Sequence, residues 1–299
     1  MMKKKWLGLV MAAALVAAAV SGCGSAKDGE AADTAGGKTD AVAEGSEAPA
    51  AETPAQTEAP AEQENVTMML AAAASLENSM VDELIPMFEE ANPNITVQGT
   101  YDSSGKLQTQ IEEGADVDVF ISAAMKQMNA LDEEGLMDKE SIVPLLENKI
   151  VMIIPASSGE TPDKFEDLLD MESVAIGDPD SVPAGQYAKE AFESMGIWDK
   201  INAKASLGTN VTEVLNWVAE GSAQGGVVYA TDAASTDKVK VVAEAPEGSV
   251  SQIIYPVGIV EASKNKEAAQ RFVEFLQGAD AMKVFEKYGF SQPAQSGAK

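Results

Sequence analysis

The sequence predicts an α/β fold with two lobes, each of them a mainly parallel sheet flanked by helices. From residue 65 onward, short apolar runs alternate with segments whose apolar residues recur at helical spacing. This alternation is typical of sheets covered by helices. It comes as two series within about 235 residues, which indicates two lobes with a cleft between them. The chain is 45% hydrophobic, enough to build a core in each lobe.

The first series begins with an apolar run at 66–72, which we expect to be a buried strand. A helix is expected at 75–91, where Pro86 should kink or restart it because proline lacks the N–H that a helix interior needs. Further strands are expected at 95–101 and 117–122, and further helices at 104–113 and 125–134.

The second series repeats this alternation and ends in two helices. Its strands are expected at 149–154, 174–177, 204–207, 226–229, 239–243 and 252–260. Its helices are expected at 165–169, 184–195, 211–220, 266–276 and 280–288.

Charge and composition exclude several classes of protein. The chain has 21 Lys and Arg against 48 Asp and Glu, a net charge of −27, which argues against a nucleic-acid partner. It contains no histidine, which excludes a Ser-His-Asp or Cys-His catalytic pair and any His-ligated metal. Its single cysteine excludes an internal disulfide and thiolate zinc sites. We therefore expect neither an enzyme nor a cofactor.

The N-terminus predicts export and a membrane anchor. Residues 1–22 resemble a signal peptide, with three lysines at 3–5 and an apolar stretch at 6–19 that is too short to span a bilayer. The next four residues, Val-Ser-Gly-Cys at 20–23, resemble a bacterial lipobox, so we expect Cys23 to be lipidated. The alternative is ordinary secretory cleavage, in which case Cys23 would have no function. Because Cys23 is the only cysteine in the sequence, we favour lipidation. The predicted location is extracytoplasmic, on the cell membrane.

Residues 23–64 are predicted to be a disordered acidic linker. From residue 24 on, this segment has ten acids and two lysines and almost no large apolar side chains. Such a composition cannot bury enough apolar surface to order a chain. We expect it to tether a folded domain that begins near residue 65 and carries a charge of −22, since −27 less +3 for residues 1–22 and −8 for the linker leaves −22.

Four junctions between strands and helices share a small or hydroxyl residue where the helix starts. A helix start exposes unpaired N–H groups and carries a partial charge of about +0.5. Four such starts in one cleft would together supply about +2, enough to bind a dianion. Ordinary capping is the alternative for any one of them. Asn210 and Glu213 fit a capping box that leaves the Val211 N–H free, and Pro183 fits a first helical position that leaves the Ala184 N–H free. The junctions lie at 73–76, 102–107, 178–185 and 208–213.

Several short motifs, in their order and spacing, make the sequence similar to one known family. They are Ala-Ala-Ser-Leu at 73–76, Ser-Ser-Gly-Lys-Leu at 103–107, Gly-Ala-Asp-Val-Asp-Val-Phe-Ile-Ser-Ala at 114–123, Gly-Asp-Pro at 177–179, Val-Pro-Ala-Gly-Gln-Tyr-Ala at 182–188, Val-Val-Tyr-Ala-Thr-Asp-Ala at 227–233 and Lys-Tyr-Gly-Phe at 287–290. With these motifs the chain resembles the molybdate-binding proteins of bacterial ABC importers from about residue 66 to residue 293.

The resemblance implies a type II periplasmic-binding-protein fold with two crossovers. One lobe would comprise 65–147 and 255–299, and the other 148–254. The ligand would be molybdate or tungstate, held between the lobes by hydrogen-bond donors without Lys or Arg. The implied partners are an ABC permease and its ATPase subunit, with the receptor a monomer. The implied ligand-binding residues are Ser75, Ser104, Ala184, Val211 and Tyr229.

Asp102 departs from the small residues familiar at this place in the family. A carboxylate beside the site could accept a hydrogen bond from a protonated anion such as hydrogen phosphate. We interpret Asp102 instead as a turn or cap residue directed to solvent, and Lys106 as pointing away from the site. A receptor for another tetrahedral oxyanion, sulfate or phosphate, stays open as the alternative, and so does a surface enzyme or adhesin on the same fold.

Overall fold

The computed structural model describes residues 64–293. The predicted signal peptide, Cys23 and the linker up to residue 63 lie outside the described residues. In the described part, the helices are too short or too polar for any of them to cross a membrane.

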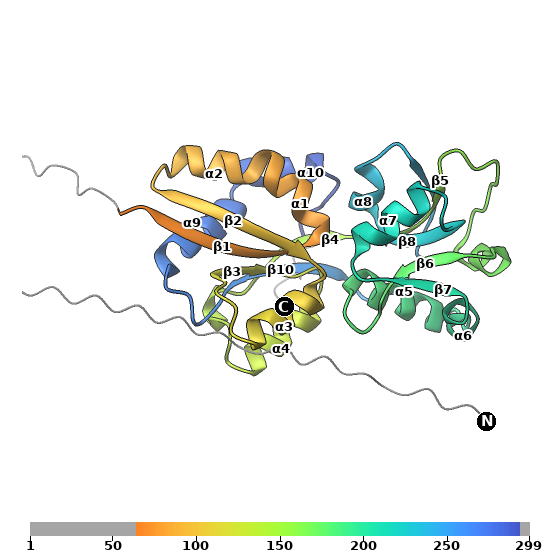
Figure 1. Ribbon diagram of the computed structural model, residues 1–299, viewed down its shortest axis with the longest axis horizontal. Coiled ribbons are helices and arrows are strands. Elements are labelled where there is room, and N and C mark those ends of the chain that lie inside the picture. The colour runs from red at the N-terminus through yellow and green to blue at the C-terminus, as the bar shows by residue number, and fades with distance from the viewer. Residues whose placement is uncertain (1–63, 294–299) are drawn as a thin grey trace, which may run out of the picture. The chain divides into compact units, whose positions relative to one another are not determined.

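The first of two five-stranded sheets has the strand order β2-β1-β3-β10-β4 (Figure 1). β1 is parallel to both of its neighbours, whereas β10 is antiparallel to both of its own. Helices cover both faces: Figure 1 shows α2 and α10 on one side and α3 and α4 on the other. The strands are β1 (Val66–Ala73), β2 (Ile95–Asp102), β3 (Val119–Ile121), β4 (Val143–Asn148) and β10 (Ile253–Ile259).

The second sheet has the order β7-β6-β8-β5-β9 and repeats this pattern (Figure 1). β6 is parallel to both neighbours, and β5 is antiparallel to both of its own. The strands are β5 (Ile150–Pro155), β6 (Val174–Gly177), β7 (Ala205–Gly208), β8 (Gly225–Tyr229) and β9 (Val239–Glu244). We call the first sheet with its helices the first lobe, and the second sheet with its helices the second lobe.

The two-lobed α/β architecture agrees with the prediction, but each sheet is mixed rather than mainly parallel. In each sheet two of the four strand pairs are parallel. The reason is the way the chain changes lobe: β4 ends at Asn148 and β5 begins at Ile150, with no helix between them. β10 likewise follows β9 of the other sheet, and every antiparallel pair involves β5 or β10, the two strands that directly follow a change of lobe. The exact lobe boundaries stay a prediction.

β4 was not expected from the sequence. Its segment, 143–148, is short and contains Pro144, which argues against a central strand. The sheet order resolves the conflict, since β4 is an edge strand where a missing N–H is tolerated.

The first helical stretch accommodates Pro86 without a break. The turn just before it, Met80–Leu84, is wound as a π-helix, and Pro86 lies in the first turn of α2. Proline is tolerated there because its missing N–H has no required partner. The stretch consists of η1 (Ala74–Leu76), α1 (Glu77–Ser79), η2 (Met80–Leu84) and α2 (Ile85–Ala91).

The remaining helices lie close to their predicted positions, except for three short ones that were not expected: η3, α6 and α8. The first-lobe helices are α3 (Ser104–Glu112), α4 (Met125–Glu133), η3 (Lys139–Ser141), α9 (Lys266–Leu276) and α10 (Ala279–Lys287). The second-lobe helices are η4 (Phe165–Asp170), α5 (Pro183–Ser194), α6 (Trp198–Asn202), α7 (Val211–Ala219) and α8 (Ala230–Ala234).

Candidate functional site

Two of the predicted residues, Ser75 and Ser104, lie at one edge of the first sheet. Ser75 follows β1 in η1, and Ser104 is the first residue of α3 after β2. β1 and β2 are parallel neighbours whose last residues, Ala73 and Asp102, are in register. Parallel strands end at the same edge, so the fold brings the two serines together.

The oxygen of Ser75 is engaged by a buried tyrosine. Ser75 Oγ lies 3.0 Å from the Tyr255 hydroxyl, which accepts a hydrogen bond from Asn148 at 3.2 Å. Burial raises the pKa of Tyr255 well above its ordinary value, so the phenol keeps its proton. That proton needs an acceptor, and Ser75 Oγ is placed to take it. The Ser75 O–H is then left to donate elsewhere.

The oxygen of Ser104 is engaged in the same way by the main chain. Ser104 is fully buried, and its Oγ accepts the Ala123 N–H at 2.9 Å. The hydroxyl proton is again left for another acceptor. Ser104 therefore accepts from a protein donor, Ser75 is placed to do the same, and each can then offer an O–H, as binding an anion requires.

Tyr229, at the end of β8, meets the first lobe at the same place. Its hydroxyl donates to the Ala123 carbonyl at a long 3.4 Å. The ring lies edge-on to that of Tyr255, with 5.5 Å between centroids. Burial raises the pKa of Tyr229 well above its ordinary value, which keeps this group a donor.

Ala184 and Val211 lie at matching edges of the second sheet. They follow β6 and β7, parallel neighbours with Gly177 in register with Gly208. Ala184 is the second residue of α5 and Val211 the first of α7, and both are buried. N–H groups in the first helical turn have no acceptor four residues back, so neither of these two N–H groups has a partner within its own helix.

A glycine allows this approach of α5 to its strand. A Cβ on Gly185 would lie 2.0 Å from the Gly177 carbonyl oxygen, a contact no side chain can make. Because Gly185 directly follows Ala184, the start of α5 is pressed onto the end of β6.

The predicted capping box at Asn210 is half correct. Asn210 is the N-cap of α7, and its side-chain oxygen accepts the Glu213 N–H at 2.9 Å. The Glu213 carboxylate accepts the Thr209 N–H at 2.7 Å instead of the Asn210 N–H that the box would use. Val211 is the first helical residue, as predicted.

Hydrogen bonds between the lobes place the five residues along one interface. Gly105, next to Ser104, donates its N–H to the carbonyl of Ser181, three residues before Ala184, at 3.0 Å. The Tyr229 bond to Ala123 crosses the same interface beside Ser104.

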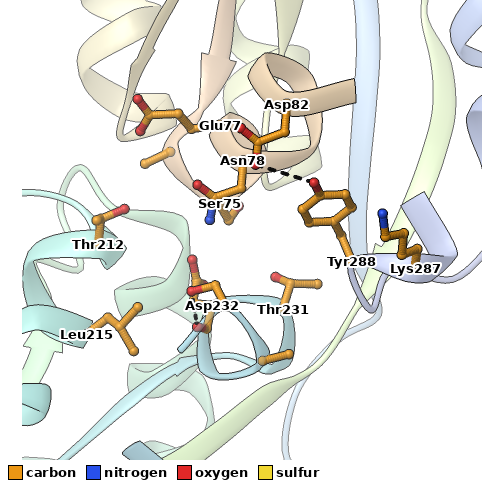
Figure 2. A pocket seen from close by; sticks show the side chains of 13 residues that line it. Ser75, Glu77, Asn78, Asp82, Thr212, Leu215, Thr231, Asp232, Lys287 and Tyr288 are labelled. Atoms are coloured by element: carbon orange, nitrogen blue, oxygen red, sulfur yellow. Dashed lines mark hydrogen bonds between the residues drawn. The ribbon is translucent and has the colours of Figure 1, made fainter. Parts of the chain in front are cut away.

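A cavity of about 470 Å³ opens between the lobes on the Ser75 side (Figure 2). Figure 2 shows Ser75 from the first lobe and Thr212, Leu215 and Asp232 from the second around this space. Thr212 follows Val211, so the cavity joins the surroundings of Ser75 and Val211. Of the five predicted residues, Ser75 alone lines this cavity; the other four, Ser104, Ala184, Val211 and Tyr229, are buried and do not line it.

Charged groups near the site are neutralised or sequestered. The Lys106 ammonium lies 3.1 Å from the Asp102 carboxylate. The buried Asp232 carboxylate accepts the Tyr229 N–H at 3.2 Å, and burial raises the pKa of Asp232 to about 7. Glu77, Asp82 and Lys287 also line the cavity, and the Lys287 ammonium lies 2.6 Å from the Glu83 carboxylate. The five predicted residues themselves offer only hydroxyl and N–H groups to an anion.

The interpretation of Asp102 as a residue directed to solvent is wrong. Its carboxylate accepts the Ser103 N–H at 2.7 Å and, across the lobe interface, the Asn210 side-chain N–H at 3.3 Å. These two donors and Lys106 engage Oδ1, and Oδ2 accepts from Lys106 at 3.3 Å, which weakens the case for Asp102 as an acceptor for a protonated anion such as hydrogen phosphate.

Sequence reasoning missed the supporting residues of the site. Tyr255 and Ala123 contact the serine oxygens, and Asn148 donates to Tyr255, yet a tyrosine in an apolar run and an asparagine at the end of a strand carry no specific signal. Ser103 was overlooked beside Ser104. Its hydroxyl is buried and has no hydrogen-bond partner among the described residues.

Comparison with known proteins decides the class. Residues 68–291 match the family of bacterial extracellular solute-binding proteins. The chain belongs to this family. As a solute-binding protein it is a transport protein rather than an enzyme, as predicted. Within residues 64–293 there is also no group of three or more acidic, His or Cys side chains that could hold a metal ion.

Relatives of this solute-binding protein include proteins named for molybdate or molybdenum. The putative ABC transporter substrate-binding lipoprotein YvgL of Bacillus subtilis is 41% identical over 77% of this chain and 88% of its own. The molybdate-binding protein ModA of Escherichia coli is 36% identical over 74% of this chain and 87% of its own. The solved substrate-binding domain of a putative molybdenum ABC transporter from Clostridium difficile is 38% identical, with a TM-score of 0.60 over 77% of this chain and 100% of that domain.

Proposed function

We propose that this solute-binding protein is a receptor for molybdate, and also for tungstate, that delivers the anion to an ABC permease and its ATPase subunit. The relatives named for molybdate or molybdenum support the ligand. The observation that carries the proposal is the state of the two serines. Ser104 Oγ accepts the Ala123 N–H, and Ser75 Oγ lies within hydrogen-bond distance of the Tyr255 hydroxyl, an arrangement in which both serine hydroxyls can donate to an anion.

The proposed shell consists of donors from both lobes. Ser75 and Ser104 would contribute hydroxyls and N–H groups, Ala184 and Val211 main-chain N–H groups, and Tyr229 its phenol. Molybdate at neutral pH is an unprotonated dianion that can only accept hydrogen bonds. A shell made only of donors therefore presents no group that the anion cannot satisfy. Hydrogen bonds to an ion are about twice as strong as bonds between neutral groups. Because donors come from both lobes, the anion would favour the closed arrangement.

The acidic surface does not contradict an anionic ligand. Exposed charges more than about 8 Å away are largely screened at physiological salt. The site itself lies among buried donors, and two carboxylates beside it are engaged: Asp102 is paired with Lys106, and Asp232 accepts the Tyr229 N–H. Local hydrogen bonds should therefore decide affinity, while the surface charge slows ligand entry.

Calorimetric titration of the chain from residue 24 onward tests the proposal. We expect tight binding of molybdate and tungstate and much weaker binding of sulfate and phosphate, because the larger anions would span the distance between the donors of the two lobes. Phosphate binding as tight as that of molybdate would contradict the proposal. If sulfate bound as tightly as molybdate, the protein would instead be a general receptor for tetrahedral oxyanions.

We also propose that Cys23 carries the lipid anchor and that the receptor works as a monomer on the outer side of the cell membrane. The lipoprotein name of the Bacillus subtilis relative supports this location. Replacing the thiol in a Cys23→Ser variant should move the protein from the membrane fraction to the soluble fraction without changing its affinity for molybdate. A variant that still sediments with membranes would refute lipidation.

A further inference from the structure

Asp102 makes a hydrogen bond that crosses from the first lobe to the second. It is the last residue of β2, two positions before Ser104. Its Oδ1 accepts from the Ser103 N–H at 2.7 Å and from the Lys106 ammonium at 3.1 Å, both within the first lobe. The same oxygen accepts from Asn210 Nδ2 in the second lobe at 3.3 Å.

Asn210 uses both ends of its side-chain amide. The oxygen caps α7 by accepting the Glu213 N–H, and the nitrogen donates to Asp102. The amide therefore ties the start of α7 to the end of β2. The residue that follows Asn210 is Val211, whose N–H belongs to the proposed shell. The bond that fixes the position of Asn210 therefore also restricts the position of the Val211 N–H.

The charge of Asp102 suits this role. A bare carboxylate close to a dianion would repel it, but the Lys106 ammonium offsets the charge. The start of α7 also carries a positive partial charge, which a nearby carboxylate favours. The Asp102 side chain is 27% exposed, so the bond to Asn210 is worth less than a fully buried one.

We propose that Asp102 and Asn210 form a latch between the lobes that sets how long the closed state lasts, and with it how slowly a bound anion leaves. Both are positioning residues: they act on the placement of the α7 start and are not members of the anion shell. The part concerning the anion rests on the proposed function; the part concerning closure does not.

A double-mutant cycle with Asn210→Ser and Asp102→Ala tests the latch. Serine is as good an N-cap as asparagine, so α7 stays capped, but it is too short to reach Asp102. We expect Asn210→Ser to raise the dissociation rate of molybdate about three- to tenfold, with little change in the association rate. In the Asp102→Ala background it should add nothing. A similar effect in both backgrounds, or none in either, would overturn the latch.

A matched control lies within the second lobe. The Gln224 side chain accepts the Glu172 N–H at 2.6 Å, and both residues of this hydrogen bond belong to the second lobe. Gln224→Ala removes a polar contact of similar kind, so it should leave the dissociation rate unchanged. A rise equal to that of Asn210→Ser would show that the rate follows general loosening of the lobe.

A measurement without ligand separates this inference from the proposed function. Spin labels at Lys126 in α4 and Ser194 in α5, both exposed, report the distance between the lobes in the full chain carrying Cys23→Ser. We expect Asn210→Ser to shift the distances to longer values, with no further shift when Asp102→Ala is added. If molybdate does not bind but the distances shift, the proposed function fails and the latch stands. If molybdate binds and neither rates nor distances change, the latch fails alone.

Discussion

The starts of α3 in the first lobe and α7 in the second approach each other across the interface, and they differ in how they are capped. At α7, Asn210 caps the helix and Glu213 accepts the Thr209 N–H, so side chains satisfy the first turn. At α3 the N-cap is Ser103, which makes no capping bond and buries a hydroxyl without a partner among the described residues. At α7, the oxygens of Asn210 and Glu213 thus accept main-chain N–H groups at its start, whereas α3 keeps hydroxyls available.

This difference teaches how each lobe can contribute to an anion site. The first lobe offers side-chain hydroxyls, whose removal is a simple substitution. The second lobe offers main-chain N–H groups at α5 and α7, together with the phenol of Tyr229, and the main-chain groups can be removed only by proline. Variants at the two helix starts should therefore behave differently.

The largest effect is expected at α3. Ser104→Ala removes one hydroxyl donor to a charged ligand, worth about 1.5–3 kcal/mol, so affinity for molybdate should fall roughly 10- to 150-fold. It also leaves the buried Ala123 N–H without its acceptor, which should lower the melting temperature. Calorimetry for binding and thermal unfolding of the ligand-free chain measure the two effects. Unchanged affinity would exclude Ser104 from the site.

A smaller effect is expected at α7. Asn210 is in extended conformation, φ −155° and ψ 173°, which a following proline favours, and proline is well tolerated as a first helical residue. Val211→Pro should keep the fold, seen as an unchanged circular dichroism spectrum, and weaken molybdate binding about tenfold or more through loss of one N–H.

Val211→Ala is the control for that variant, because it keeps the N–H and loses only packing of a buried side chain. Equal affinity of the alanine and proline variants would refute a main-chain donor at this position. Unfolding of the proline variant alone would show that the Val211 N–H serves the fold.

The smallest effects are expected on the free energy of unfolding, which should distinguish the N-cap of α7 from the N-cap of α3. Asn210→Ala removes a working cap and should lower the free energy of unfolding by about 1 kcal/mol. Ser103→Ala removes a hydroxyl that makes no capping bond, so it should change the free energy of unfolding by less than about 0.5 kcal/mol. Chemical denaturation of the two ligand-free variants compares them. An equal loss in both would mean that the two helix starts are equivalent.

The sequence was sufficient for the features that depend on neighbouring residues. Helical spacing located α5, α7 and α9 to within a residue or two, and the Asn210–Glu213 pair located the start of α7. The direction of strands was harder, because pairing of β10 with β3 and β4 joins segments more than 100 residues apart.

The supporting contacts of the site could not be predicted for the same reason. The bonds from Tyr255 to Ser75 and from Ala123 to Ser104 depend on which strand lies beside which. The bond between Asp102 and Asn210 depends further on how the lobes meet, which no local pattern records.

Asn148 has a consequence for movement between the lobes. It is the last residue of β4, two positions before the first residue of β5, and its buried amide donates to Tyr255 in β10, the strand that returns from the second lobe, and to Thr231 in α8. β4 and β10 pair along their length in the first sheet, and the bond to Thr231 ties the same amide to the second lobe, so a rotation of the lobes that preserves these bonds must turn about Asn148. The pivot and Ser75 share the phenol of Tyr255, so the axis of such a rotation passes next to a group that would bind the anion.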